Sequence, residues 1–178
     1  LTVIQDAYET EYLATQWPVD DYGVRQQRVV SQISERALGG DDSRHLMDQT
    51  VILVAECFRA DRCEILELLP SKQEMVLRSA YGWARETIGA SQFVVEPGGE
   101  LEFVLERRRT VASEDVRSER RFQIRINPEA DDIRSSLWVR ISRGADAFGI
   151  LGVHFRKERL FAASDSAFML SVSNVLTT

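Results

Sequence analysis

The sequence predicts an α+β fold built on a mainly antiparallel sheet of about six strands. Two observations predict it: apolar residues recur at helical spacing near both ends of the 178-residue chain, and short runs typical of strands fill the middle. The links between neighbouring strands have hairpin length, which favours antiparallel pairing. Helices from both ends of the chain would then share one face of the sheet.

Residues 1–23 are predicted to form a helical connector ahead of the domain, which we expect to span residues 24–178. The connector places its apolar residues on one side of a helix, at Leu1, Ile4, Tyr8 and Tyr12. Pro18 then disfavours helix at the residue before it. The chain begins without methionine and stops at Thr178 within a helical pattern, so we expect it to be a fragment of a longer protein.

Two helices open the domain. The first is predicted over residues 24–38, and Gly39-Gly40 ends it because glycine tolerates the left-handed conformation that closes many helices. The second begins after a cap at Asp42 or Ser43, and its apolar residues recur at helical spacing as far as Phe58.

The middle of the chain changes to the patterns of strands. We expect three strands, a short helix and a fourth strand, which cover residues 62–69, 75–83, 92–95, 100–108 and 110–112 in that order. A charged, irregular segment follows.

The last third of the chain predicts two strands and a closing helix. Residues 137–142 alternate between apolar and other side chains, and residues 148–155 form the second strand. Ser164 or Asp165 is expected to cap the final helix, whose apolar residues recur at helical spacing.

Composition and charge argue against several classes of function. The net charge of −6 disfavours general nucleic-acid binding, which depends on an excess of lysine and arginine. No apolar run approaches the roughly 20 residues that a membrane span needs, so we expect no membrane contact. The two cysteines, Cys57 and Cys63, do not have the spacing of a disulfide framework or a structural zinc site. We therefore expect a cytoplasmic protein without a metal, in which both thiols are small buried apolar groups.

Four segments of the second half resemble, in their order and spacing, the GAF domain family. Asp115-Val116 followed by Arg121-Phe122 is similar to the family's DV…RF segment. Residues 134–141 resemble its RSLLxVPL strand, and residues 148–153 resemble the GVLxV strand that follows. Residues 161–165 are similar to the FxxxD entry into the family's closing helix.

The resemblance covers residues 24–178 in element order. It implies a six-stranded antiparallel sheet with terminal helices on one face and a small-molecule pocket under a lid on the other. It also implies a regulatory sensor, not an enzyme, within a cytosolic signalling protein such as a two-component histidine kinase, a cyclic-di-GMP enzyme or a transcriptional regulator. Such a domain would be covalently linked to an output domain, form a homodimer through its terminal helices, and transmit its ligand state through them. Arg140 stands where many members have proline, so the edge of that strand is expected to differ.

The cofactor-binding versions of the family fit this sequence poorly, and we expect no cofactor. A covalent bilin needs a cysteine in the second half, but none follows Cys63. His45 and His154 lack metal-pair spacing, and we interpret them as partly buried, hydrogen-bonded histidines rather than haem ligands. The cyclic-nucleotide signature is incomplete because Ser166 follows Asp165 where glutamate is expected. Methionine sulfoxide reductases of the family need several cysteines around the pocket, so we expect no catalytic residue.

Residues 107–134 hold eight of the chain's 22 basic residues and correspond to the family's lid. Guanidinium groups bind phosphate and carboxylate with bidentate geometry, so one hypothesis is an anionic ligand bound by Arg121 and Arg125. The alternative is a solvated loop, because acidic residues alternate with these arginines.

Trp138 and Arg140 are out of phase with the apolar residues of their strand. They would therefore point to the pocket face if the apolar residues pack on the helices. An aromatic ring and a cation there would suit a planar or anionic ligand, and plain packing under the lid is the alternative. The candidate ligand-binding residues are Phe93, Phe103, Arg121, Phe122, Arg125, Trp138 and Arg140. The competing function is a ligand-free dimerisation or interaction module whose pocket is filled by the aromatic members of this set.

Overall fold

An open sheet of six antiparallel strands forms the centre of the computed structural model, which describes residues 22–124 and 132–177. The strand order is β3-β2-β1-β6-β5-β4, and each neighbouring pair is antiparallel. The strands are β1 (Arg62–Leu68), β2 (Glu74–Tyr81), β3 (Gln92–Val94), β4 (Val111–Ser113), β5 (Ser135–Arg143) and β6 (Asp146–Phe155). The predicted α+β fold class is thus confirmed.

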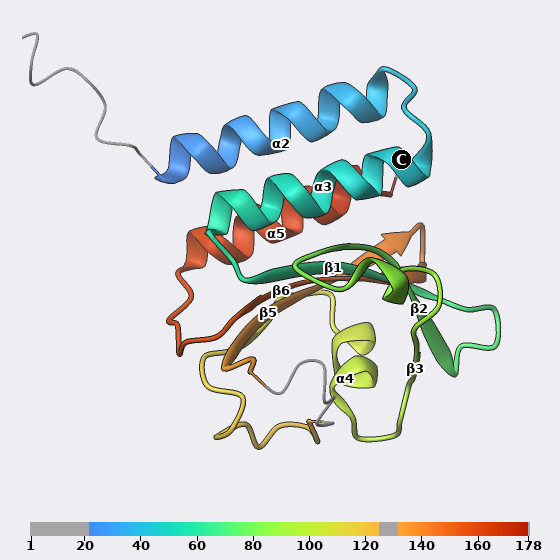
Figure 1. Cartoon of the computed structure of the whole chain (residues 1–178), viewed down its shortest axis with the longest axis vertical. Helices are drawn as coiled ribbons and strands as arrows, with labels where there is room; N and C mark the ends of the chain where they lie inside the picture. The colour runs from blue at the N-terminus through green and yellow to red at the C-terminus, as the bar shows by residue number, and fades with distance from the viewer. Residues whose placement is uncertain (1–21, 125–131, 178) are drawn as a thin grey trace, which may run out of the picture.

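Helices cover the two faces of this sheet unequally (Figure 1). The helices are α2 (Tyr22–Leu38), α3 (Ser43–Phe58), α4 (Glu100–Glu106) and α5 (Ala163–Val175), with a short 3-10 turn at Arg85–Thr87. Helices α3 and α5 pack on one face, and α2 lies outside them in contact with both. Helix α4 lies on the opposite face. The prediction that the terminal helices share one face is confirmed.

The core between the sheet and the helices arises from the alternation of side chains along the central strands. Every second residue of these strands points to α3 and α5: Cys63 and Ile65 in β1, Leu137, Val139 and Ile141 in β5, and Leu151, Val153 and Phe155 in β6. We call this the helix-side core. Both cysteines are buried in it, as expected, and burial raises the pKa of Cys57 to about 11 and also raises that of Cys63.

The strand boundaries and the end of α4 differ from the sequence-based expectation by one or two residues, and the starts of α2 and α5 also differ. Helix α2 begins at Tyr22 and includes Gly23, which the sequence analysis assigned to the connector; residues 1–21 of that connector lie outside the described residues. Helix α5 begins at Ala163, so neither Ser164 nor Asp165 occupies the cap position. The carboxylate of Asp165 instead lies in the first turn and accepts the backbone N–H of Ala162, the residue before the helix, at 3.0 Å.

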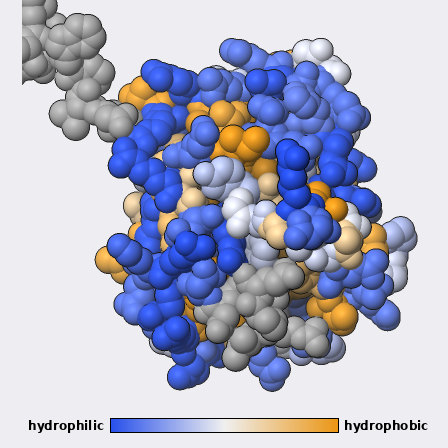
Figure 2. Space-filling model, in the orientation of Figure 1, coloured by the Kyte–Doolittle hydropathy of each residue, from blue (hydrophilic) through white to orange (hydrophobic). Residues whose placement is uncertain are grey.

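The face of the molecule seen in Figure 2 is mostly polar. In the view of Figure 2, hydrophilic residues cover most of the face, and hydrophobic residues appear as patches between them. Among the described residues, no helix combines the length and the apolar character needed to cross a membrane.

Candidate functional site

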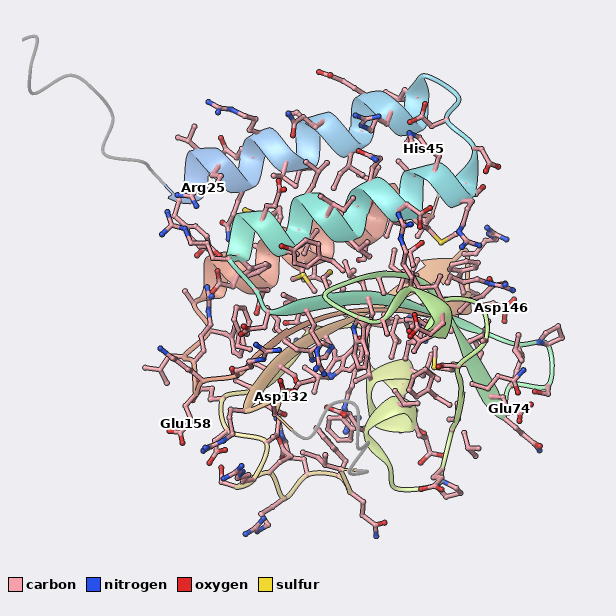
Figure 3. All side chains as sticks on the ribbon, in the orientation of Figure 1. Arg25, His45, Glu74, Asp132, Asp146 and Glu158 are labelled. Atoms are coloured by element: carbon pink, nitrogen blue, oxygen red, sulfur yellow. The ribbon has the colours of Figure 1, made fainter. Side chains whose placement is uncertain are left out.

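The sheet face opposite α3 and α5 carries a second core beneath α4, and side chains fill the space between the two (Figure 3). Its buried members are Leu66, Met75, Leu77, Val104, Val111, Phe122, Trp138 and Ile150. We call this the α4-side core. It is the face that the sequence analysis expected to hold a pocket.

Trp138 occupies the middle of this face because its neighbour on β6 is a glycine. Trp138, Gly152 and Glu64 stand opposite one another across β5, β6 and β1. A Cβ atom on Gly152 would lie 2.3 Å from Cζ3 of Trp138, so only glycine leaves room for the indole ring. The ring is 4% exposed, and its Nε1–H donates to Oε1 of Glu100 on α4 at 2.9 Å.

A buried histidine lies beside this tryptophan. The ring centroids of Trp138 and His154 are 4.7 Å apart in an edge-to-face arrangement. The hydroxyl oxygen of Ser136 lies 2.8 Å from Nδ1 of His154, and Nε2 of His154 lies 3.3 Å from Oε1 of Glu64. We call Glu64, Glu100, Ser136, Trp138 and His154 the polar cluster.

Two atoms of the polar cluster have no hydrogen-bond partner among the described residues. His154 and Glu64 are 2% and 4% exposed. The contact of Nε2 of His154 with Oε1 of Glu64 lacks hydrogen-bond geometry, and neither Nε2 nor the other oxygen of Glu64, Oε2, has a partner within residues 22–124 and 132–177. A buried polar group without a partner costs about 1–3 kcal/mol. Such a group is a candidate for contact with a bound molecule.

The second carboxyl group of the cluster is also removed from water. Burial is the main reason that the pKa of Glu100 is raised above its ordinary value, and the negative charge of Glu64 acts in the same direction. The charge of His154 and the hydrogen bond from Trp138 oppose this shift. This face of the sheet therefore brings together the carboxyl groups of Glu64 and Glu100 and the imidazole of His154, all poorly solvated.

The predicted aromatic site residues gather on this face. Phe103 and Phe122 lie with their ring centroids 4.9 Å apart, and Phe122 and Trp138 are buried in the α4-side core. Phe93 packs against the same core from β3. Whether these residues bind a ligand stays a prediction.

The predicted arginines are bound to other parts of the protein. Arg140, which pairs with Ile150 within β5 and β6, donates from Nη1 to the carbonyl of Leu105 and from Nη2 to that of Ala145, both at 2.9 Å. Arg121 donates from Nε to Oε1 of Glu119 at 3.0 Å and also bonds the carbonyl of Ala112. The Arg121 hydrogen bond lowers the pKa of Glu119 to about 2. Arg125 lies outside the described residues.

Sequence analysis missed most of the polar cluster. Glu64, Glu100 and Ser136 were not singled out, and His154 was interpreted only as a buried histidine. That interpretation holds for His154, whereas His45 is exposed at the start of α3 because it lies on the outer side of that helix, 4.0 Å from Asp41. One signal was present: Glu64 lies between the apolar residues Cys63 and Ile65 of its strand, where a charged group needs a partner.

Ser136 belongs to the same buried network, since it is 3% exposed and its hydroxyl oxygen lies 2.8 Å from Nδ1 of His154. Within residues 22–124 and 132–177, no group of three or more histidine, cysteine, aspartate or glutamate side chains could hold a metal ion.

No protein-family model and no curated protein sequence matches the chain. Solved structures do match it. The GAF domain of a phosphoenolpyruvate-protein phosphotransferase from Coxiella burnetii has a TM-score of 0.77 at 19% identity, over 87% of this chain and 92% of its own. The free methionine-R-sulfoxide reductase of Neisseria meningitidis, solved in complex with its substrate, has a TM-score of 0.75 at 15% identity, over 91% and 92%. The phycocyanobilin-bound GAF domain of a cyanobacterial phytochrome has a TM-score of 0.68 at 14% identity, over 85% and 91%.

Proposed function

The chain has the fold of GAF domains, and we propose that it serves as a regulatory, small-molecule-sensing domain of a larger cytosolic signalling protein. The output partner would be a histidine kinase, a cyclic-di-GMP enzyme or a transcriptional regulator. The observation that carries this proposal is the polar cluster, because it places unpaired buried polar atoms on the sheet face opposite the terminal helices. Apolar binding sites with a few convergent polar groups are typical of small-molecule recognition.

The strands of the cluster offer a path from the ligand to the helices. Alternate residues of one strand face opposite sides of the sheet, so Glu64 lies in the cluster while Cys63 and Ile65 lie in the helix-side core. His154 likewise stands between Val153 and Phe155 of that core. Close-packed interiors transmit small displacements. A ligand that moves β1 against β6 would therefore change the packing under α3 and α5.

A regulatory role fits better than catalysis by a thiol. One of the similar structures is a free methionine-R-sulfoxide reductase, which is an enzyme, so the fold does not separate the two functions. Both cysteines of this chain lie in the helix-side core, and burial raises the pKa of each thiol, which lowers its reactivity. Neither thiol is on the side of the sheet that carries the polar cluster.

A second candidate function is a ligand-free interaction module. The indole of Trp138 over Gly152, together with the Phe103–Phe122 pair, favours it because these rings occupy the face where a ligand would bind. The two functions predict different responses to small molecules.

The experiment is a screen of the purified domain by thermal unfolding and two-dimensional NMR against a collection of cellular metabolites. The reporter is the indole Nε1–H resonance of Trp138, assigned by its loss in Trp138→Phe. A sensor is expected to show saturable shifts of this resonance and a higher melting temperature with one chemical class. If no metabolite shifts that resonance, the ligand-free module is the correct function.

A further inference from the structure

Glu64 is the residue of the polar cluster that most needs a partner. It is 4% exposed, and no residue in the described part of the chain forms a hydrogen bond with its Oε2 atom. A buried carboxylate is stable only when hydrogen bonds or opposite charges replace its lost hydration. Its neighbour in the cluster is His154, which is 2% exposed and whose Nε2 lies 3.3 Å from Oε1 of Glu64 without a hydrogen bond to any described residue.

Neither neutral form of the histidine satisfies this carboxylate. If Ser136 donates to Nδ1, then the Nε2–H group faces Glu64 at 3.3 Å with poor alignment, and Oε2 remains unpaired. If Nδ1–H donates to Ser136, then Nε2 is an acceptor, and two acceptors lie side by side. In both cases Oε2 of Glu64 lacks a donor, and in the second case Nε2 of His154 lacks one too, so a donor that reaches both atoms selects the Nδ1–H form of His154.

The rest of the cluster adds acceptors and negative charge. Glu100 contributes a second carboxyl group that interacts electrostatically with Glu64 and His154. The indole N–H of Trp138 is already donated to Glu100. The site therefore complements a cation that carries several N–H donors.

The arginines of the same face give little support to an anionic ligand. Arg121 is bound to Glu119, and Arg140 is bound to two backbone carbonyls. Arg62, at the start of β1, pairs with Asp132 at 3.1 Å. A metal cation is not favoured either, since the described residues contain no suitable group of ligands.

We propose that the polar cluster binds a small organic cation of the amidinium or guanidinium class, with its N–H groups directed at Oε2 of Glu64 and Nε2 of His154. The planar, parallel N–H donors of such a group can reach two adjacent acceptors at once. This proposal rests on the proposed sensor function and names the class of its ligand.

The test is a titration of the domain with three probes of the same shape: acetamidinium, acetamide and acetate. The readouts are the indole resonance of Trp138 and the ring resonances of His154. We expect saturable shifts with acetamidinium and none with the neutral or anionic probe. Glu64→Gln removes the charge while keeping the size of the side chain, and it is expected to weaken acetamidinium binding by about tenfold or more.

The control variant is Asp146→Asn, which removes one negative charge eight positions from His154 along β6. Asp146 lies on the side of the molecule away from Asp132 and Glu158 (Figure 3), and its substitution is expected to leave binding unchanged. Glu100→Gln provides a second test if Glu64→Gln does not fold. This substitution should also weaken the binding of acetamidinium.

Three outcomes overturn the proposal: equal or tighter binding of acetamide or acetate, binding of acetamidinium that Glu64→Gln and Glu100→Gln leave unchanged, and no binding of any probe. If the metabolite screen then finds a neutral or anionic ligand that shifts Trp138, the sensor function stands and only this ligand class is wrong. If the screen is also negative, the sensor function fails as well.

Discussion

Gly152 shows how a single residue determines the arrangement of the polar cluster. Without a side chain at this position, the indole of Trp138 lies against β6 and reaches Glu100 on α4. The same ring contacts His154 edge to face, which fixes one side of the imidazole. Because Gly152 has no Cβ atom, the indole ring of Trp138 can connect the three central strands β1, β6 and β5 with helix α4.

Glu100 is the residue for which the structure predicts a pH dependence. Its pKa is raised by burial, so the folded state holds this proton more tightly than the unfolded state, whose glutamate pKa is about 4.3. Ionisation of Glu100 therefore lowers the free energy of unfolding of the protein as pH rises above about 4.3.

Glu100→Gln should abolish that loss, because an amide oxygen can still accept the Trp138 N–H and carries no charge. We expect the variant and the parent to have similar melting temperatures at pH 4 and the variant to be more stable at pH 8. Thermal unfolding across this pH range measures the difference, with Glu106→Gln at the exposed end of α4 as the control. A difference that does not change with pH would show that the Glu100 carboxyl is well solvated.

The link between α2 and α5 is the main feature at the scale of elements. The carboxylate of Asp165, 3% exposed in the first turn of α5, accepts the hydroxyl of Tyr22 at 2.8 Å and the amide of Gln26 at 3.2 Å. It also accepts the backbone N–H of Ala162. A single side chain thus joins the start of α2 to the start of α5, which are the helices proposed to transmit the signal.

Asp165→Ala is predicted to destabilise the domain by about 2–3 kcal/mol, because it leaves the buried amide of Gln26, the half-buried hydroxyl of Tyr22 and the backbone N–H of Ala162 without this acceptor. Tyr22→Phe removes only one of these donors and should cost about 1 kcal/mol. Urea denaturation measures both values. Ser171→Ala is the control, since its hydroxyl donates to the carbonyl of Ala167 within α5, at 2.9 Å, and not to another element. Equal losses for all three variants would contradict the role of Asp165.

Helix α2 dominates one side of the whole molecule. It forms the outermost layer, and Leu38 at its end is 85% exposed while Val24 near its start is 48% exposed. These residues are 14 positions apart, which is close to four helical turns, so they lie near the same side of the helix. Exposed apolar residues on a terminal helix are typical of a helix that pairs with a second copy.

We predict a homodimer that depends on this side of α2. Sedimentation of the purified domain should show a dimer at high protein concentration, and Leu38→Glu should shift it to the monomer by placing a charge in the interface. Leu160→Glu changes a residue that is similarly exposed but lies outside the helices, and it should leave the dimer intact. A parent domain that is monomeric at every concentration would overturn this prediction.

Local patterns made part of the site predictable. The alternation of residues 137–142 placed Trp138 and Arg140 on the face away from the helices, and the structure confirms it because side chains on a strand must alternate. The same pattern could not show where the guanidinium of Arg140 ends. Its partners are the carbonyls of Leu105 and Ala145, which only the folding of α4 and the β5–β6 turn onto β5 brings within reach.

The sequence by itself determined the order of the elements, the antiparallel sheet and the face on which each strand residue lies, since these follow from short-range periodicity and turn residues. Only the tertiary structure decided that Glu64 meets His154, 90 positions later in the chain. That meeting depends on the register of β1 against β6, and the indole of Trp138 reaches Glu100 only because α4 folds over the sheet. Register between distant strands is a property of the whole core, because it is chosen by the packing of both faces at once.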